Sequence, residues 1–391
     1  MQNRSALFLS PESPYPPVGG GALRTASLLE YLVQHYTVDV IVFRQPGDPD
    51  PRSAFPPGKV RRVFVLDLPF HSKSGPARAF RNGIRLLRGR PPLLDRFSGF
   101  ESAIDGMLDG SSYGVGIVEH FWCAPYLKQL RPRCKKLLID LANIESVWHQ
   151  RVAGTSGAAA ALVHKRFAAA YRRLETNLLP RYDELLVTSA GDAQAIRALA
   201  GQTLITVYPN ALPQVAIPET PKQFSIVFSG NLEYQPNISA IRFFRSEIWP
   251  ILRGRWPGLT WEIVGKNPQA IADMLTGDST IHLVGPVPDA IAAIARSQIA
   301  VVPVLAGSGT RVKILEAWAA ATPVVSTTIG AEGLEYAAGE HLLIADTPAH
   351  FAEAVSALLG SEHERQRIGR KGRQLYQDNY TWNAAWSRLT I

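Results

Sequence analysis

The sequence predicts an α/β protein built from two doubly wound parallel sheets, and two observations lead to this fold class. Short apolar runs alternate with amphipathic segments along all 391 residues, which is the rhythm of βαβ units. Many runs are continuously apolar rather than alternating, as expected for parallel strands covered on both faces. Each sheet would form a Rossmann-like domain with ligand-binding loops at the carboxyl ends of its strands.

The first half carries the first of these sheets. Its apolar runs predict strands at residues 6–10, 38–43, 60–66, 115–119, 136–140, 184–188 and 203–208. Helical periodicity between the runs predicts helices at about residues 22–35, 76–88, 143–178 and 190–199.

The second half repeats the pattern after residues 212–223, a segment with three prolines that reads as a linker. The predicted strands are residues 225–230, 261–265, 281–285, 299–304, 323–327 and 341–345. The predicted helices are about residues 237–253, 287–297, 311–321, 348–360 and 362–377. We therefore expect domains over residues 1–212 and 213–378, with a C-terminal helix at about 379–391 packing back on the first domain.

Composition excludes several classes of protein. The only cysteines are Cys123 and Cys134, which argues against a disulfide scaffold and favours a reducing, cytoplasmic compartment. No apolar run reaches the ~18 residues of a membrane-spanning helix. The apolar core near the N-terminus, residues 6–9, is too short for a signal peptide. The net charge of +8 leaves nucleic acid, a membrane surface or an anionic small molecule open as partners.

A first glycine-rich loop, residues 19–21, separates the first predicted strand from the helix that follows it. Gly20 and Gly21 allow a ligand to approach the backbone closely, and a helix N-terminus favours negative charge. Arg24, one turn later, supplies a bidentate donor for phosphate or carboxylate. The alternative is a flexible turn after the proline-rich residues 11–17.

A second loop lies at residues 306–318, where AGSGTRVKILEAW leads from an apolar strand into a helix. Thr310 is suited to cap this helix. Arg311 and Lys313 fall at its start, where cations oppose the helix dipole and destabilise the helix unless an anion is bound. A bound diphosphate would supply that anion, and the loop therefore predicts a diphosphate site.

Two nucleotide motifs do not fit the second loop. The dinucleotide fingerprint requires a third glycine where Val312 stands, and the next strand ends in Ser326 and Thr327 instead of an acidic residue. A Walker loop requires GxxxxGK[ST], which the sequence lacks. A nicotinamide cofactor is therefore not expected.

Four blocks of the sequence resemble the retaining GT-B glycosyltransferases of family 4, in its GTRxKxxE subgroup. They are PPVGGGALRTASLLEYL (16–32), FSGNLEYQPNISAIRFF (228–244), GSGTRVKILEAWAAATPVVSTTIGAEGLE (307–335) and RKGRQLYQDNYTWNAAW (370–386). The resemblance implies two Rossmann-like domains facing a cleft, with a nucleotide-sugar donor on the second domain and an acceptor mainly on the first.

The resemblance also implies roles for residues of the second domain. In the family's E-x7-E pair, the second position matches Glu316, expected on the ribose hydroxyls, while Ser308 stands at the first. The family's usual Arg and Lys after the first strand of this domain are absent, and Arg311 and Lys313 look like their substitutes. The donor site implied is Gly20, Gly21, Gly230, Asn231, Gly265, Gly285, Val287, Ser308, Gly309, Thr310 and Glu316.

In the first domain, His120 matches a family histidine near the anomeric centre of the donor, with a core or surface histidine as the alternative. Arg24, Asn143 and Glu145 are expected to orient the acceptor, although Asn143 is equally suited to cap the long helix. Catalytic roles are thus expected for His120, Arg311 and Lys313.

The resemblance implies transfer with retention, in which the leaving diphosphate accepts the acceptor's proton, so neither a metal nor a cofactor is expected. Asp48 and Asp50 spell the D-x-D of metal-dependent enzymes, but they lie in a proline-rich turn cluster. A sugar-nucleotide epimerase and a noncatalytic or nucleic-acid-binding protein are the alternatives. No RNP-like or helix-turn-helix pattern supports nucleic acid as a partner.

The positive charge is concentrated in a segment without acidic residues, residues 68–94. Arg78, Arg81, Arg85 and Arg88 share one helical face, beside a stripe of Phe80, Ile84 and Leu87. This pattern predicts contact with an anionic bilayer at the inner face of the membrane, which suits a lipid-linked acceptor. The alternative is a solvated basic face over a small core stripe.

Overall fold

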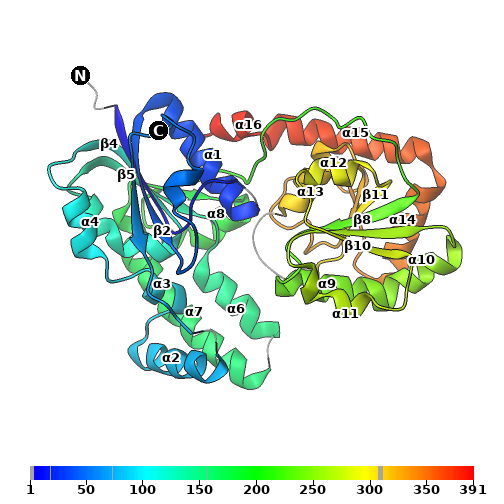
Figure 1. The fold of residues 1–391 in the computed structure, drawn as a ribbon, viewed down its shortest axis with the longest axis horizontal. Coiled ribbons are helices and arrows are strands. Elements are labelled where there is room, and N and C mark those ends of the chain that lie inside the picture. Colours follow the sequence, from blue (N-terminus) through cyan, green and yellow to red (C-terminus); the bar gives the residue numbers. More distant parts are fainter. Residues whose placement is uncertain (1–3, 18, 73, 156, 307–310) are drawn as a thin grey trace. The chain divides into compact units, whose positions relative to one another are not determined.

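The computed structural model describes residues 4–17, 19–72, 74–155, 157–306 and 311–391. The chain divides into two compact units, Met1–Pro209 with Arg388–Ile391, and Asn210–Ser387. Each unit is a parallel sheet with helices on both faces (Figure 1). This is the predicted fold class, an α/β protein with two Rossmann-like units.

Within its described residues, the first unit contains a seven-stranded parallel sheet in the order β3-β2-β1-β4-β5-β6-β7. The direction of strand addition reverses between β1 and β4, which makes the carboxyl ends of these two strands the expected place for a ligand. The strands are β1 (Ser5–Ser10), β2 (Thr37–Arg44), β3 (Arg62–Asp67), β4 (Tyr113–Glu119), β5 (Cys134–Leu141), β6 (Glu184–Val187) and β7 (Leu204–Val207).

The four helices predicted in the first unit are present, but one of them is divided, and three short helices at residues 92–96, 101–107 and 127–130 were not predicted. The stretch predicted as one helix over residues 143–178 forms two, because the backbone at Gly157 is extended (φ −61°, ψ 156°) and glycine is a weak helix former. The helices are α1 (Gly20–His35), α2 (Gly75–Arg88), α3 (Pro92–Arg96), α4 (Glu101–Met107), α5 (Leu127–Leu130), α6 (Glu145–Thr155), α7 (Ala158–Leu178) and α8 (Ala190–Ile196).

The second unit contains, among its described residues, a six-stranded parallel sheet in the order β10-β9-β8-β11-β12-β13. Its strand addition reverses between β8 and β11, the counterpart of β1 and β4. The strands are β8 (Ser225–Ser229), β9 (Thr260–Val264), β10 (Ile281–Gly285), β11 (Ile299–Val302), β12 (Val324–Ser326) and β13 (Leu343–Ile344).

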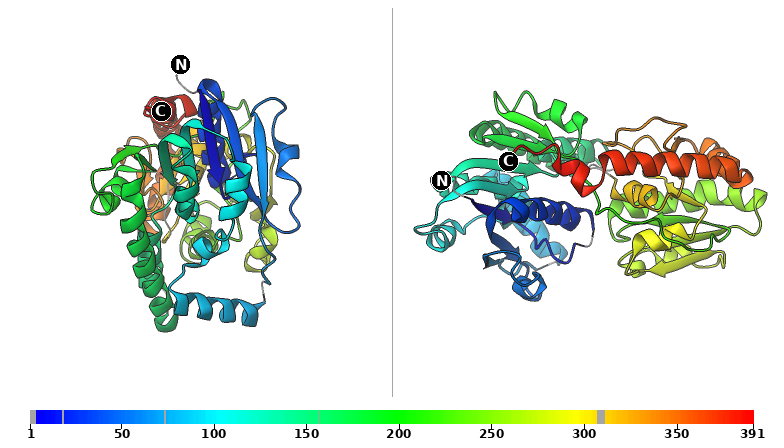
Figure 2. Two further views of the ribbon diagram at one scale, coloured as in Figure 1. Left: turned by 90° about the vertical axis from the view of Figure 1, so that its left-hand side faces the viewer. Right: turned by 90° about the horizontal axis from the view of Figure 1, so that it is seen from above.

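A π-helical turn, Phe244–Ile248, interrupts the helix predicted over residues 237–253. Pro250 follows it and lacks the N–H that would continue the α-helical ladder. The last helix is also shorter than the predicted 379–391, because α15 extends to Asn379 and α16 ends at Trp386 (Figure 2). The helices are α9 (Gln235–Phe243), α10 (Trp249–Arg255), α11 (Ala272–Leu275), α12 (Ala290–Ala295), α13 (Val312–Ala319), α14 (Pro348–Gly360), α15 (Glu362–Asn379) and α16 (Trp382–Trp386).

The central strands form the cores of the two units. Every residue of β1 and of β8 is buried, which confirms that the continuous apolar runs are strands covered on both faces. Among the described helices, none has the length and apolar character needed to cross a bilayer.

Candidate functional site

Three glycines form a bare backbone surface at the carboxyl ends of β8, β9 and β10. The N–H of Gly230 donates to the carbonyl of Val264 (3.0 Å), and the N–H of Gly265 donates to the carbonyl of Gly285 (2.8 Å). A Cβ at Gly265 would lie 1.7 Å from the Gly230 oxygen, so no other residue fits there without moving a strand. The glycines therefore keep the strand ends close together, and Asn237 and Lys313 lie against the place that a Cβ at Gly230 would take.

Lys313 lies beside this surface, in the first turn of α13. Its Nζ donates to Asn237 Oδ1 (2.7 Å) and stands 4.1 Å from the centre of the Phe228 ring. Asn237 is held in turn by the bond from its Nδ2 to the carbonyl of Asn231 (2.7 Å). Desolvation and the neighbouring Arg311 lower the pKa of Lys313 to about 7. Among the described residues, no carboxylate forms an ion pair with Lys313.

Glu316 follows one turn along α13. It accepts a hydrogen bond from Ser229 Oγ (3.3 Å), and desolvation raises its pKa to about 7. Arg311, which immediately precedes α13, is 7% exposed and donates to the carbonyl of Ile329 (3.4 Å). The start of α13 thus holds Arg311 together with Lys313 and Glu316, whose pKa values are both moved to about 7, as is common at functional sites.

The other predicted donor residues fall in three places. Asn231 accepts from the Glu233 N–H (3.2 Å), and Val287 is half-buried in the loop after β10. Gly20 and Gly21 begin α1, whose N-terminus has neither a side-chain cap nor an acidic residue in its first turn. Ser308, Gly309 and Thr310, including the predicted cap, lie outside the described residues.

In the first unit, Glu119 occupies the point where strand addition reverses. One oxygen, Oε2, accepts from Ser10 Oγ (2.8 Å) and Thr25 Oγ1 (2.7 Å). The other, Oε1, is buried without a hydrogen-bond partner in the described part of the chain. Burial and the nearby Asp140 raise the pKa of Glu119 to about 8. Glu119 was not among the predicted site residues, although its place at the end of an apolar strand was a signal in the sequence.

Arg24 lies inside the first unit rather than on its loop surface. It is 2% exposed and forms a bidentate ion pair with Asp140 (2.7 and 2.5 Å), while its Nη1 donates to the carbonyl of Tyr208 (2.7 Å). This finding differs from the expectation of an open donor pair facing a ligand. The guanidinium of Arg24 is already paired with Asp140, which lies two strands away in the sheet and which no local sequence pattern reveals as a partner.

His120 follows β4 with a backbone conformation that is unusual for a non-glycine residue (φ 60°, ψ 141°). Its N–H donates to the carbonyl of Asp140 (2.9 Å), and its ring stacks on Trp122 with centroids 4.5 Å apart. Burial lowers the pKa of His120 to about 4, so the imidazole is neutral near pH 7. Such backbone conformations cost about 1–3 kcal/mol and cluster at functional sites.

Glu145, the first residue of α6, is connected to His120 through Trp122. The Trp122 Nε1 donates to Glu145 Oε1 (2.9 Å), and burial together with Glu175 raises the pKa of Glu145 to about 7. Asn143 is half-buried two residues before α6. The structure therefore brings His120 and Glu145 to one stacked cluster at the carboxyl ends of β4 and β5.

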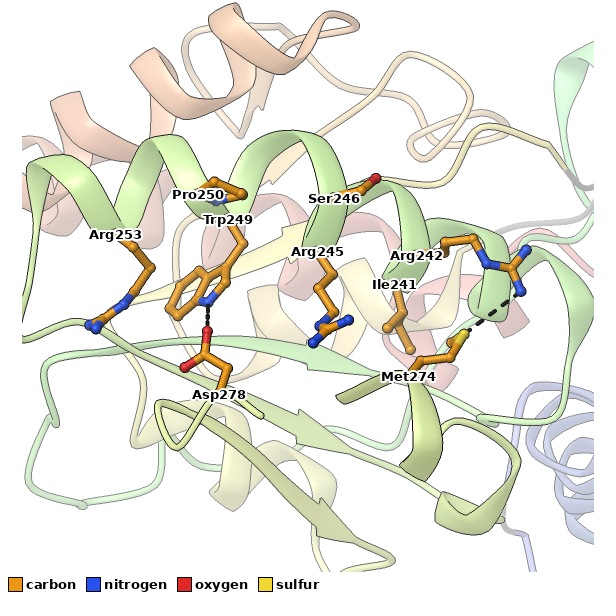
Figure 3. Close-up of a pocket in the computed structure, with 9 residues that line it drawn as sticks. All are labelled: Ile241, Arg242, Arg245, Ser246, Trp249, Pro250, Arg253, Met274 and Asp278. Atoms are coloured by element: carbon orange, nitrogen blue, oxygen red, sulfur yellow. Dashed lines mark hydrogen bonds between the residues drawn. The ribbon is translucent and has the colours of Figure 1, made fainter. Parts of the chain in front are cut away.

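Two further features lie away from the strand ends. A groove of about 630 Å³ runs along α9 and α10, with Met274 and Asp278 on its other side (Figure 3). Asp278 accepts there from Trp249 Nε1 (2.9 Å), and Arg245 donates to the carbonyl of Thr276 (3.0 Å). None of the predicted site residues lines this groove.

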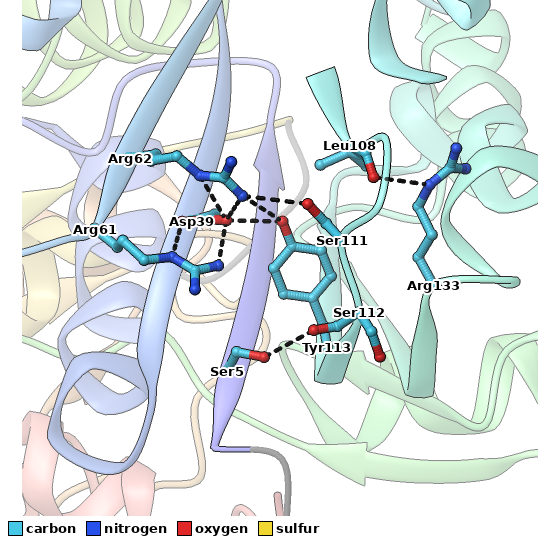
Figure 4. A network of polar contacts seen from close by, with 9 residues as sticks. All are labelled: Ser5, Asp39, Arg61, Arg62, Leu108, Ser111, Ser112, Tyr113 and Arg133. Carbon is cyan, nitrogen blue, oxygen red and sulfur yellow. Dashed lines mark hydrogen bonds and ion pairs between the residues drawn. The ribbon is translucent and has the colours of Figure 1, made fainter. Parts of the chain in front are cut away.

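The second feature is an ion-pair network at the amino ends of the strands in the first unit (Figure 4). Asp39 accepts from Arg61 (2.6 and 2.8 Å), from Arg62 and from the Tyr113 hydroxyl (2.8 Å). Since ligands bind at the opposite, carboxyl ends, this network is structural. Asp50, part of the D-x-D sequence, accepts a hydrogen bond from the Arg52 N–H and so caps a 3-10 turn. Among the described residues, no group of three or more possible metal ligands occurs.

The fold and the strand-end site define the class of protein to which the chain is similar. Two Rossmann-like units with parallel sheets are the architecture of the GT-B glycosyltransferases. Residues 223–361, within the second unit, match the family model described as Glycosyl transferases group 1.

Solved structures of low sequence identity share this fold over nearly the whole chain. Sucrose-phosphate synthase from Thermosynechococcus elongatus covers 98% of this chain and 97% of its own, at 18% identity and a TM-score of 0.69. HepE from Anabaena in complex with UDP-glucose covers the same shares at 14% identity and a TM-score of 0.65. TarM from S. aureus, in complex with Fondaparinux, alpha-GlcNAc-glycerol and UDP, covers 98% of each chain at 10% identity and a TM-score of 0.66.

A curated relative is also similar to part of the chain. An uncharacterized 44.6 kDa protein in the cps region of Klebsiella pneumoniae is 25% identical over 173 residues. The alignment covers 42% of this chain and 45% of that protein, so it spans less than half of either.

Proposed function

We propose that the protein is a retaining, metal-independent hexosyltransferase of family 4, which transfers a sugar from a nucleotide-diphosphate sugar to a glycan or lipid-linked acceptor. The observation that carries this proposal is Lys313 at the start of α13, which forms no ion pair among the described residues and lies beside the glycines that end three strands. A diphosphate would supply the negative charge that this place lacks. The structures of HepE with UDP-glucose and of TarM with UDP support a nucleotide-sugar donor.

In this proposal the second unit stabilises the leaving group. Lys313, Arg311 and the α13 N-terminus lie where charge develops on the departing diphosphate, and fixed donors of this kind are usually the largest single contribution to catalysis. Glu316 holds the ribose hydroxyls, and the glycine backbone lies against the nucleotide. The leaving diphosphate then accepts the proton of the acceptor hydroxyl.

The first unit supplies the remaining groups. His120, a neutral imidazole, lies near the anomeric carbon, while Asn143 and Glu145 orient the acceptor. The relative in the cps region favours cell-surface polysaccharide synthesis as the setting. A lipid-linked acceptor would place the protein in the cytoplasm, at the inner face of the membrane.

The test begins with a thermal-shift panel of nucleoside diphosphates, followed by transfer assays with the sugar nucleotide of the base selected. Removing one preorganised donor typically lowers kcat by about 10²–10³. We expect Lys313→Ala and Arg311→Ala each to lower kcat by this factor while the protein remains folded. Lys371→Ala, which removes an exposed lysine paired with Glu340, is the control. Turnover near the wild-type value in both site variants would disprove the proposal.

A sugar-nucleotide epimerase is the second candidate, because it would need the same donor site. Incubating the sugar nucleotide alone separates the two functions. An epimerase converts the donor without any acceptor, whereas a transferase forms the glycosylated product only when the acceptor is present.

A further inference from the structure

The most exposed large apolar side chains named in the described residues gather on one short segment of the first unit. Phe70 is 79% exposed, Phe80 is 72% exposed and Leu87 is 90% exposed. Phe80 and Leu87 stand two turns apart on α2, which lies at the rim of the unit beside α7 (Figures 1 and 2). Gly83, between them, has open space where a Cβ would be. Phe80 and Leu87 therefore face outward, while Ile84, the third residue of the predicted stripe, is half-buried.

The arginines of α2 are not arranged as the sequence predicted. Arg85 is turned toward the protein, where its Nε pairs with Asp95 (2.9 Å) and only 11% of its side chain is exposed. Arg81 donates to the carbonyl of Ser72 (2.6 Å). The side chain of Arg78 lies outside the described residues. Two of the four arginines predicted to contact a bilayer are thus engaged within the protein, while Arg88 is exposed.

We infer that α2 is an interfacial helix that inserts Phe80 and Leu87 into the acyl boundary of an anionic bilayer. Helices of this kind bury their apolar face and keep cations at the headgroups. Arg88 and Arg90, both exposed at the C-terminal end of α2, provide those cations. Insertion of apolar side chains, rather than attraction by a row of arginines, supplies most of the binding.

Charge identifies the bilayer as the occupant of this surface. Residues 68–94 contain no acidic side chain, and Asp95, which borders the segment, is paired with Arg85. Basic residues beside exposed apolar ones complement anionic lipid headgroups and the acyl region beneath them. This inference does not depend on the proposed reaction, because none of these residues belongs to the strand-end site.

The test is cosedimentation of the full chain with vesicles of phosphatidylcholine, with and without phosphatidylglycerol. Burial of one such side chain contributes roughly tenfold to one-hundredfold to partitioning. We expect Phe80→Ser and Leu87→Ser each to weaken binding by about that factor at both low and high salt. Arg88→Gln combined with Arg90→Gln should weaken it by no more than about thirtyfold, and only at low salt.

The matched control is Leu204→Ser, which removes a half-exposed leucine on β7 and should leave vesicle binding unchanged. The midpoint of thermal unfolding, compared with that of the wild type, confirms that every variant is folded. Wild-type binding by the Phe80→Ser, Leu87→Ser double variant would overturn the inference. So would loss of self-association in that variant without any change in vesicle binding, because the surface would then be an interface with a second copy.

Discussion

Binding of a diphosphate should change the protonation of Lys313, and this prediction tests the site most directly. In the free protein, desolvation and Arg311 lower the pKa of the Lys313 ammonium from 10.5 to about 7. A bound diphosphate places negative charge beside Nζ, and an opposite charge favours the protonated form. The pKa of Lys313 should therefore rise on binding, and the complex should take up a proton whenever the free lysine was neutral.

The magnitude follows from the pKa of about 7. About half of the Lys313 side chains carry a proton at pH 7, about one in eleven at pH 8 and about one in a hundred at pH 9. Only the protonated form binds the diphosphate well. The affinity should thus fall about fivefold between pH 7 and 8 and about tenfold between pH 8 and 9, with almost one proton taken up at pH 8. The terminal phosphate, with a pKa near 6, stays ionised over this range.

Stability should change in the opposite direction over the same pH range. Because the pKa of Lys313 is lower in the folded protein, the unfolded chain binds more protons between pH 7 and about 10.5. The contribution of Lys313 to the free energy of unfolding therefore becomes more favourable as the pH rises, while affinity for the diphosphate declines. A general loss of structure at high pH would lower both.

The assay is isothermal titration calorimetry of the nucleoside diphosphate in two buffers with different ionisation enthalpies. Lys313→Arg is the control, because a guanidinium stays protonated throughout, so the part of the pH dependence that comes from Lys313 should disappear. Glu316→Gln removes the other group with a pKa of about 7 and should keep the proton uptake. Absence of proton uptake at pH 8, or equal uptake by Lys313→Arg, would refute the reasoning.

Three other predictions concern stability and are checked by urea unfolding. His120→Gly should be more stable than His120→Ala by about 1 kcal/mol, because φ is 60° at this position and glycine adopts that value without strain. At ordinary positions the glycine variant is the less stable of the two, so that order here would show that the backbone is unstrained. Gly265→Ala should lower the free energy of unfolding by about 3 kcal/mol, because its Cβ would meet the carbonyl of Gly230. Gly258→Ala should lower it far less, because a Cβ there makes only ordinary van der Waals contact. Burial alone would raise the pKa of Asp39, but hydrogen bonds from two arginines and a tyrosine lower it to about 2. Asp39→Asn should therefore lower the free energy of unfolding by about 1–2 kcal/mol at pH 7, after allowance for the half-exposed arginines. The difference in stability between the variant and the wild type should disappear as the pH falls from 4 through 2.

The sequence predicted the sheets well because each strand is marked locally. The strand predicted at residues 281–285 has the same bounds in the structure, and the run at 225–230 differs by one residue. Parallel strands buried on both faces must be apolar throughout, so a single strand reveals itself without knowledge of its neighbours.

The sequence did not predict the residues that hold the site together, because their roles depend on contacts between distant segments. Asn237 positions Lys313 from 76 residues away, and Ser10 binds Glu119 across 109 residues. Periodicity also shows that a helix is amphipathic without showing which face turns inward. On α2, the pairing of Arg85 with Asp95 decides that orientation, and it leaves Leu87 outside.

The contacts of individual basic residues explain why the net charge could not distinguish among nucleic acid, a membrane surface and an anionic small molecule as partners. Many basic residues contribute to the net charge of +8, and some of them form ion pairs that stabilise the fold. Arg24 pairs with Asp140 in this way, and Arg61 pairs with Asp39. Lys313 differs because it forms no ion pair in the described part of the chain, and the nearby Glu316 only partly offsets the desolvation that lowers its pKa. Such a cation destabilises the free protein, where it is only partly protonated near pH 7, and a bound anion should restore its full charge. In this chain we therefore expect the anion site to be marked by the cation that lacks an ion pair at the strand ends, and not by the total number of basic residues.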